Sequence, residues 1–368
     1  MTVSPKQTEK RAVAVWALTP PGLELARRIA RYMPECRIFF SSRLSAKDLP
    51  GRSFSRLQEA VNKHFHNHAA HIFIMAAGIA VRTVAPLIRD KTRDPAVIVA
   101  DEKGIHVISL LSGHLGGANA LAERVAGMIG AAPVITTATD IHGLPAIDVW
   151  SREKGLVIEN IEAVKVVHGA LLAKAPIALR DPWGVFREDL KKAAVTVFEF
   201  SRAEMPLKAD AGIFIDDVLL ALSKNVLILR PPTLVAGIGC NRNTSMAEIQ
   251  QVLSAVFQRF GLSERSLKEI ATVDVKVGEK GLSELARKLF LPISFFSASE
   301  LNAVKAIKSP SVRVERHIGA KSVCEAAAIL GSNQGNLIVP KQKTQNVTVA
   351  VARVPFLSWE SVREPSTI

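Results

Sequence analysis

The sequence predicts a multi-domain α/β protein with mostly parallel sheets flanked by helices, in which two strand–loop–helix α/β domains are joined by a smaller central domain. Over the first 150 residues, short apolar runs alternate with amphipathic helical stretches, which is typical of parallel sheets covered on both faces. A second apolar strand running into a glycine loop begins at Leu234, just after Arg230-Pro231-Pro232. We therefore expect an N-terminal domain at 1–150, a central connecting domain at 151–230 and a C-terminal domain at 231–368.

The elements of the first domain follow from hydrophobic periodicity. Runs of β-branched residues predict strands, and apolar residues three or four apart, such as Leu25 and Ile29, predict helices. The turn Asp101–Gly104 joins two of the strands, and Asp101 and Glu102 are expected to be turn residues rather than a catalytic pair. The expected strands are 12–18, 37–40, 72–75, 96–100, 105–110 and 133–136, and the expected helices are 23–32, 57–66, 77–88 and the one within 109–127.

The same reading covers the rest of the chain. In the last domain, Ser245 and Glu248 form a predicted capping box, and Ala326–Ala328 provides small residues for close helix packing. The expected strands are 176–179, 194–198, 212–215, 226–229, 234–239, 271–276, 291–295, 337–340 and 346–351, and the expected helices are 162–173, 246–260, one beginning near 279, and 319–330.

The charge balance indicates an anionic partner. The net charge is +13 and the pI is near 9.8, which fits nucleic acid, an anionic membrane surface, a polyanionic small molecule or a merely basic surface. Basic residues form no run of five, and aromatic residues make up only 5% of the chain, so a base-stacking nucleic-acid surface is disfavoured. We expect a small anion or a merely basic surface, and no nucleic acid.

The cysteines and the apolar segments predict a cytoplasmic, soluble protein. Cys36, Cys240 and Cys324 lie far apart and form no metal-binding pair, as expected in a reducing compartment without structural zinc. No leader-like segment is present at the N-terminus. The longest apolar stretch, 71–88, is interrupted by Arg82, glycine and proline, so no membrane span is expected.

The stretch 109–127, SLLSGHLGGANALAERVAG, carries the strongest functional signal. It predicts the end of a strand, a loop of small residues and the start of a helix, where unpaired N–H groups favour anions. The spacing fits neither a dinucleotide loop nor a phosphate loop. His114 lies inside this loop and can exchange a proton near neutral pH, although a solvated loop histidine is the alternative.

Three loops are predicted to share one sheet edge, because ligands of parallel sheets bind beyond the carboxyl ends of the strands. These loops are 76–78, 112–117 and 136–140. All three consist of small or hydroxyl-bearing residues, so together they favour a binding site. A capped turn is the alternative for the threonine run 136–139.

Several other groups have both a functional and a structural interpretation. A basic cluster follows the third expected strand. It either clamps carboxylates or forms a solvated surface that is paired with Asp90 and Asp94. Its members are Arg82, Arg89, Lys91 and Arg93. His64 and His68 share a helix face that suits a metal, but a polar helix end is favoured because no further ligand lies nearby.

In the last domain, Cys240 follows the strand-end glycines. Its pKa is lowered there if it lies at a helix start, but no histidine is close to support nucleophilic catalysis. Surface ion pairing is the favoured role for Lys276, Glu279 and Glu325.

Two sequence blocks resemble a known family. The stretch 74–126, which contains SGHLGGAN, and the stretch 134–148, which contains TTATD, are similar to the CbiG family of cobalamin biosynthesis. LVAGIGCNRNTSMAEI (234–249), VDVKVGEKGLSELA (273–286) and VCEAAAIL (323–330) resemble that family's C-terminal domain.

The resemblance implies a cobalt-precorrin-5A hydrolase, which opens the ring-A δ-lactone with water and releases the C20 carbon with its methyl group as acetaldehyde, giving cobalt-precorrin-5B. It implies no cofactor, since cobalt arrives with the anionic corrinoid substrate. Transient contact with other enzymes of the pathway and a homodimer are compatible with it. A non-catalytic corrinoid carrier is the alternative, and a nucleotide- or sugar-phosphate enzyme rests on the fold alone.

The resemblance assigns no catalytic residue, so the roles are inferred from the residue types. His114 is the expected general base, and Asp140 is expected to orient it or to take a second proton. The N–H groups of Gly116 and Gly117 are expected to hold the oxyanion with the hydroxyl groups of Thr136 and Thr137, and Arg82 and Lys91 to bind peripheral carboxylates. The further expected substrate contacts are Ser112, Gly113, Asn119 and Gly78.

Overall fold

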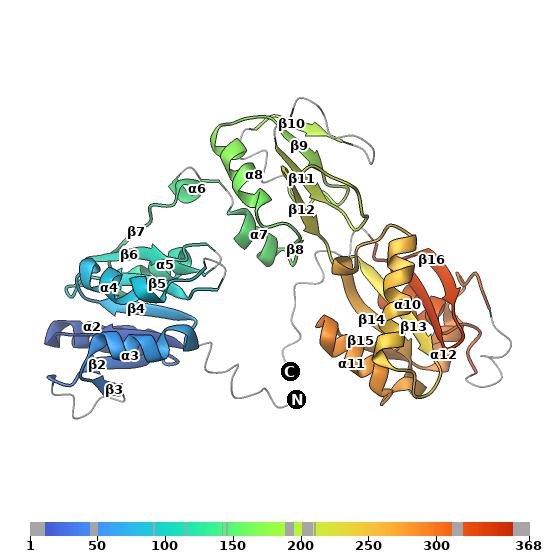
Figure 1. Cartoon of the computed structure of the whole chain (residues 1–368), viewed down its shortest axis with the longest axis horizontal. Coiled ribbons are helices and arrows are strands. Elements are labelled where there is room, and N and C mark those ends of the chain that lie inside the picture. The colour runs from blue at the N-terminus through green and yellow to red at the C-terminus, as the bar shows by residue number, and fades with distance from the viewer. Residues whose placement is uncertain are drawn as a thin grey trace. The chain divides into compact units, whose positions relative to one another are not determined.

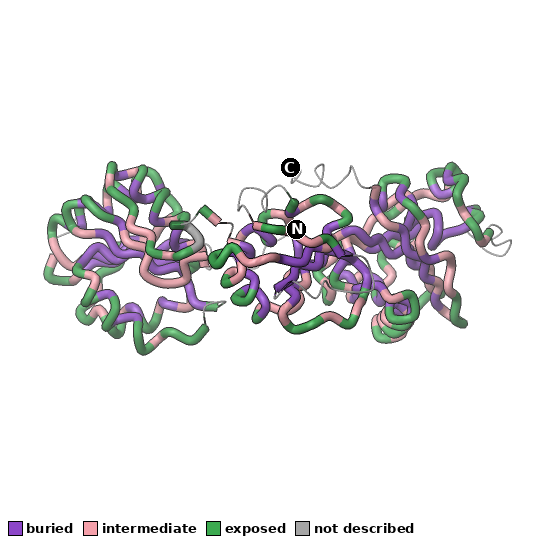
Figure 2. The backbone as a smooth tube through the Cα atoms, turned by 90° about the horizontal axis from the view of Figure 1, so that it is seen from above, coloured by how far each residue is buried: buried purple, intermediate pink, exposed green. Residues whose placement is uncertain are grey.

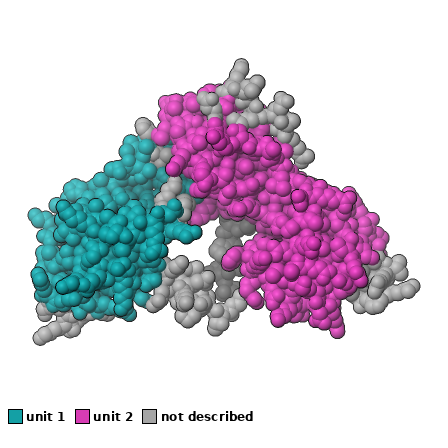
Figure 3. All heavy atoms as spheres, viewed as in Figure 1, with its two compact units in different colours: residues 1–150 teal, residues 151–368 magenta. Residues whose placement is uncertain are grey.

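The computed structural model describes residues 12–44, 51–90, 93–114, 116–141, 143–144, 146–187, 195–200, 209, 211–310 and 319–355. The chain divides into two compact units, Met1–Trp150 and Ser151–Ile368 (Figure 3). Three sheets with flanking helices confirm the predicted α/β class (Figure 1). No helix within the described ranges is long and apolar enough to cross a membrane.

The first unit contains one seven-stranded sheet with the order β3-β2-β1-β4-β5-β6-β7. Strands β1 to β5 run parallel, whereas β6 pairs antiparallel with β5 and parallel with β7. The strands are β1 (Val13–Ala17), β2 (Arg37–Ser41), β3 (Gly51–Phe54), β4 (Ala70–Ile74), β5 (Ala96–Ala100), β6 (His106–Leu111) and β7 (Ala132–Val134), and the helices are α2 (Pro20–Tyr32), α3 (Leu57–His64), α4 (Ala77–Val84), α5 (Ala118–Ile129) and α6 (Ala138–Ile141). Helix α7 (Ile147–Glu153) begins in this unit and ends in the second.

Alternating strand residues give this sheet two apolar faces. On one face Val15 and Ile72 pack with the helices α2 and α5, and on the other Trp16 and Phe73 pack with α3 and α4. The central strands are accordingly buried along their whole length, as Figure 2 shows. A sheet covered in this way leaves only its two strand-end edges for a site.

The hairpin between β5 and β6 is closed by Asp101. Its carboxylate accepts hydrogen bonds from the backbone amides of Lys103, Ile105 and His106 at 2.6–3.3 Å. Glu102 accepts a hydrogen bond from Thr19 Oγ1 at 2.7 Å. Both acidic residues are thus turn residues, as the sequence predicted.

The histidine-rich segment before β4 builds core structure. His71 is buried in β4, where its Nδ1 accepts from Trp16 Nε1 at 3.0 Å and its Nε2 lies 2.9 Å from the Phe65 carbonyl oxygen. Burial lowers the pKa of His71 to about 3, so the ring is neutral. The rings of His64 and His68 pack against Phe39, and among the described residues no group of three ligating side chains surrounds a metal position.

The second unit contains two five-stranded sheets, with the orders β10-β9-β11-β12-β8 and β15-β14-β13-β17-β16. The first has β8 (Val157–Ile158), β9 (Ile177–Arg180), β10 (Val197–Glu199), β11 (Ala211–Ile215), β12 (Val226–Arg230) and helix α8 (Ala163–Leu172). The second has β13 (Leu234–Cys240), β14 (Leu267–Val273), β15 (Ile293–Phe296), β16 (Asn336–Lys343), β17 (Val347–Arg353) and helices α10 (Met246–Arg259), α11 (Lys280–Leu289), α12 (Ala298–Ala303) and α14 (Cys324–Gly331).

A buried ion pair links the two sheets of this unit. Arg353 on β17 donates from Nε and Nη2 to both carboxylate oxygens of Asp217, which follows β11, at 2.7 and 2.6 Å. Thr233 donates to the same carboxylate at 2.7 Å. Residues of both sheets also share one hydrophobic cluster. The division of this unit at residue 230 remains a prediction.

Several elements differ from the sequence prediction, which also did not expect α6, α7, β8 and α12. Strand β3 was not expected, because GRSF is largely exposed and has no apolar alternation. Strand β14 lies at 267–273 and not at 271–276: Lys268 and Glu269 interrupt its apolar pattern, and 274–276 is a 3₁₀ turn with Val275 exposed. Helix α14 begins at Cys324, later than the expected 319.

Helix α14 also carries a buried carboxylate. Glu325 accepts hydrogen bonds from the amides of Lys308, Ser309 and Lys341 at 2.7–2.8 Å, so it fixes two neighbouring segments. The expectation of a surface ion pair at Glu325 is therefore wrong. Burial raises the pKa of this carboxyl, but the three amide hydrogen bonds outweigh it and hold the pKa below 4.5.

We expect Glu325→Gln to destabilise the protein by about 2 kcal/mol near neutral pH, because the amide group turns one acceptor into a donor facing a backbone N–H. Since the folded-state pKa is lowered, the contribution of Glu325 is present above the ordinary pKa and is lost as the pH falls through the folded value. Denaturant unfolding of both proteins across the acidic range measures this difference. Glu284→Gln, on the exposed side of α11, should change stability by less than about 0.5 kcal/mol. A difference that stays constant with pH would contradict the role.

Candidate active site

The direction of β6 decides which loops meet. Val97 at the start of β5 pairs with Leu111 at the end of β6, so the loop 112–117 lies at the edge where β4 and β5 begin. Strand β7 is parallel to β6, so Thr136 and Thr137 follow it at the same edge. The loop 76–78 follows β4 at the opposite edge, about 16 Å away along a five-residue strand. The prediction that all three loops share one edge is wrong for 76–78.

Gly78 and Arg82 consequently lie apart from the glycine loop. Gly78 is in the first turn of α4, and Arg82 Nη1 donates to the Gly78 carbonyl oxygen at 3.3 Å, which turns its side chain toward the same opposite edge. The structure does not bring these two predicted contacts together with His114.

Three N–H groups where the glycine loop enters α5 are hydrogen-bonded to carbonyl oxygens of the loop. The N–H groups of Gly117, Ala118 and Asn119 donate to the carbonyl oxygens of His114, Ser112 and Gly113 at 2.9–3.1 Å. The expected oxyanion role of the Gly117 amide is therefore not available in this conformation. The Gly116 amide has no partner within the described part of the chain, so it stays a candidate donor.

Close contacts require glycine in this loop. A Cβ at Gly116 would overlap Ser112, and one at Gly113 would lie 2.7 Å from Asn119 Oδ1. Ser112 itself has a φ of 59°, in the left-handed region that a serine rarely adopts. Its buried hydroxyl has no partner among the described residues. Backbone strain and an unsatisfied hydroxyl at one residue are typical of functional loops.

His114 lies beside a carboxylate that the sequence interpretation did not select. Its Nδ1 is 3.7 Å from Oδ1 of Asp148 on α7, and the two side chains are only 16% and 11% exposed. The separation is that of an ion pair rather than a hydrogen bond. Asp148 is the last residue of GLPAID, which lies in the block 134–148 that resembles the family. No spacing in the sequence identified it as a partner of His114.

The predicted partner of His114 was Asp140. Its backbone lies in helix α6, but its side chain is outside the described residues, as is the whole of Lys91. Both assignments stay predictions. The observed neighbour of His114 is Asp148.

Asn119 on α5 forms hydrogen bonds with two other elements of the site. Its Oδ1 accepts from Ser109 Oγ on β6 at 2.6 Å, and its Nδ2 donates to Thr137 Oγ1 at 3.0 Å. Because Thr137 accepts here, its own hydroxyl proton can still be donated to a ligand. Thr136 is exposed beside it. Asn119 thus positions Thr137 relative to the glycine loop.

Two predictions for the second unit differ from the structure because the residues are buried. Burial raises the pKa of the Cys240 thiol, whereas a helix start was expected to lower it. The nearby Lys276 acts against this rise. Lys276 Nζ and Glu279 Oε1 form a 3.0 Å pair that is mostly buried rather than on the surface.

Fold and site together define an α/β protein with a partly buried histidine–carboxylate pair at one sheet edge. Family models match three consecutive parts of the chain: Cobalamin synthesis G N-terminal at residues 59–140, Cobalamin biosynthesis central region at 145–231 and Cobalamin synthesis G C-terminus at 234–352. The chain therefore belongs to the CbiG family of cobalamin biosynthesis, as its motifs predicted.

Relatives match over nearly the whole length. A cobalt-precorrin-5A hydrolase of Priestia megaterium is 32% identical over 363 residues, covering 95% of this chain and 96% of that protein. The corresponding hydrolase of Salmonella typhimurium is 36% identical over 349 residues, covering 92% and 97%. A crystal structure of a cobalamin biosynthesis protein G homologue from Sulfolobus solfataricus has 21% identity and a TM-score of 0.35, covering 96% of this chain and 100% of that one.

We expect Gly116→Ala to displace the loop that carries His114, because its Cβ has no room beside Ser112. The cost should be about 1–3 kcal/mol, as for other overpacked sites. Backbone amide NMR shifts of Ser112 and Asn119, together with thermal unfolding, measure it.

Gly127→Ala is the matched control. Gly127 lies inside α5 with nothing within 4 Å of a built Cβ, so alanine should stabilise the helix by about 0.5–1 kcal/mol. Unchanged amide shifts in Gly116→Ala would show that the loop tolerates a side chain there.

Proposed function

We propose that this protein is a cobalt-precorrin-5A hydrolase of cobalamin biosynthesis. The observation that carries the proposal is the match to two hydrolases of that name at 32% and 36% identity over at least 92% of this chain. These relatives support the hydrolase and not the alternative of a non-catalytic carrier.

The reaction needs a base at two points. Water attacks the carbonyl carbon of the ring-A δ-lactone, which leaves a carboxylate and a free hydroxyl group. Removal of the hydroxyl proton then breaks the carbon–carbon bond to the macrocycle. The electron pair returns to the ring, which takes up a proton, and acetaldehyde leaves. A histidine that titrates near neutral pH can take and return these protons.

His114 is the proposed general base. With Asp148 facing Nδ1 at 3.7 Å, the neutral ring carries its proton on Nδ1 and offers Nε2 as acceptor. Asp148 also stabilises the imidazolium that forms when Nε2 takes a proton. We assign the positioning role to Asp148, which acts through His114.

The donors proposed for the developing oxyanion are the Gly116 amide and the hydroxyl group of Thr137, with Thr136 beside it. Thr137 is held by Asn119 with its own proton available. Ser112 and Gly113 shape the loop around these donors.

We also propose a cytoplasmic location, because none of the three cysteines forms a disulfide. The protein is proposed to need no cofactor of its own, since cobalt comes with the substrate. The anionic corrinoid suits the net charge of +13. The proposal also includes that the protein forms a homodimer and contacts other enzymes of the pathway transiently.

We expect His114→Ala to lower acetaldehyde release from cobalt-precorrin-5A under anaerobic conditions by about a hundredfold or more, because the general base is lost. Asp148→Asn should lower kcat about tenfold with little change in KM, since it misorients the base without touching the substrate. A shifted pH dependence of kcat in Asp148→Asn separates this positioning role from a merely structural one.

His106→Ala is the matched control. His106 lies at the other end of β6 and faces Asp101 at 3.8 Å, in a pair that is 57% and 39% exposed, so its loss should leave turnover unchanged. Normal turnover in His114→Ala would remove His114 from the mechanism. Tight corrinoid binding by the wild-type protein without acetaldehyde release would establish the carrier.

A further inference from the structure

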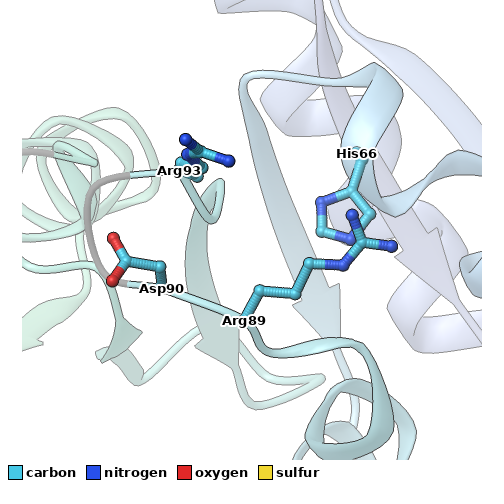
Figure 4. Close-up of a pocket in the computed structure, with 4 residues that line it drawn as sticks. All are labelled: His66, Arg89, Asp90 and Arg93. Carbon is cyan, nitrogen blue, oxygen red and sulfur yellow. The ribbon is translucent and has the colours of Figure 1, made fainter.

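A cavity of about 370 Å³ in the first unit is lined by His66, Arg89, Asp90 and Arg93. The guanidinium groups of Arg89 and Arg93 face it from different sides, and His66 lies beside Arg89 (Figure 4). The lining is therefore predominantly cationic, with Asp90 as its single carboxylate.

Both arginines lack a counter-ion among the residues that the structure describes. Neither Arg89 nor Arg93 forms an ion pair with another described residue, whereas Arg27, Arg56 and Arg124 pair with nearby carboxylates, as Arg56 does with Glu59 at 3.0 Å. Pairing of these two arginines with Asp90 or Asp94 is therefore not observed among the described residues. Two guanidinium groups converging on one cavity fit planar anions, which they bind through paired N–H groups.

Hydrogen bonds to Asp94 and Asp90 fix the backbone at the two arginines. Asp94 is buried, and its Oδ2 accepts from the amides of Arg89 and Asp90 at 2.8 and 2.9 Å. The amides of Arg93 and Asp94 donate to the Asp90 carbonyl oxygen at 3.0 and 2.8 Å. The backbone at 89–90 and 93–94 is thus hydrogen-bonded before any ligand arrives, which lowers the entropic cost of binding.

The cavity lies at the same sheet edge as His114. His66 precedes β4 and Arg93 precedes β5, and both strands begin where β6 ends in the glycine loop. Neighbouring strands are about 4.8 Å apart, so the starts of β4 and β5 are within about 10 Å of the end of β6 along this edge. One large ligand can span both places.

We propose that Arg89 and Arg93, with His66, form a subsite for carboxylate side chains of the substrate while its lactone lies at His114. The subsite rests on the proposed hydrolase function, and it replaces Arg82 as the carboxylate clamp. The carboxylates of a corrinoid acid supply the planar anions that the two guanidinium groups match.

A stable corrinoid tests the subsite without turnover. Cobyrinic acid carries the acid side chains, and its full methyl ester lacks their charge. We expect wild-type protein to bind the acid, and Arg89→Gln and Arg93→Gln to bind it about tenfold more weakly each, while affinity for the ester stays the same in all three proteins. Arg93→Lys should recover only part of the loss, since the amine lacks the fork of donors.

Arg56→Gln is the control, because Arg56 is exposed at the opposite edge and paired with Glu59. Thermal melting verifies that each variant is folded. Equal acid affinity in wild type and both variants, failure of the wild type to bind the acid, or an equal loss of ester binding would overturn the subsite. Competition by inorganic phosphate at concentrations as low as those of the acid would identify a phosphate site instead.

Kinetics separates this proposal from the hydrolase assignment. With cobalt-precorrin-5A, Arg89→Gln and Arg93→Gln should raise KM about tenfold and retain kcat, because they bind carboxylates remote from the lactone. Absence of acetaldehyde release by wild type would refute the hydrolase and leave the cobyrinic acid result to stand. Normal KM in both variants with normal wild-type turnover would refute only the subsite.

Discussion

The reversal of chain direction between β5 and β6 determines which residues meet in the first unit. Asp101 accepts hydrogen bonds from three backbone amides and closes the five-residue connection, so β6 returns antiparallel to the five strands before it. The glycine loop then emerges where β4 and β5 begin, at the same sheet edge as Arg93, which precedes β5. With a parallel β6, the same loop would face Gly78, and the arginines would lie at the other edge. One turn therefore decides the composition of the site.

The glycine loop holds the position of His114 and leaves the Gly116 amide as its candidate donor. Its helix-start N–H groups are satisfied within the loop, so the helix start at Ala118 contributes less to anion binding than its sequence implies. The loop instead holds His114 against Asp148, and Asn119 binds both Ser109 and Thr137. Anion binding falls to the arginines of the neighbouring loop. The division is physically sound, because a proton-transfer group needs a fixed, partly dry position, whereas peripheral carboxylates can be bound near solvent.

Periodicity and composition predicted the fold class, most strands and the glycine loop with His114. Three features were missed for identifiable reasons. Strand direction is not encoded in apolar patterns, although the short Asp101–Gly104 connection already excluded a parallel pair, which needs a crossover of about a dozen residues. Asp148 meets His114 only through tertiary folding across 34 positions of sequence. The internal partners of the loop amides depend on φ angles such as that of Ser112, which residue type alone does not predict.

Strand β6 carries two histidine–aspartate pairs that differ mainly in burial. His106 and Asp101 at its start are 57% and 39% exposed and 3.8 Å apart, and His114 and Asp148 beyond its end are 16% and 11% exposed and 3.7 Å apart. Coulomb attraction at equal distance weakens as water screens it, so burial favours the interaction between Asp148 and His114 over that between Asp101 and His106. Water competes for the exposed pair, and Asp101 already binds three amides of its turn. Both pairs therefore share their geometry, and removal from water is the difference that favours His114 over His106 in the proposed role.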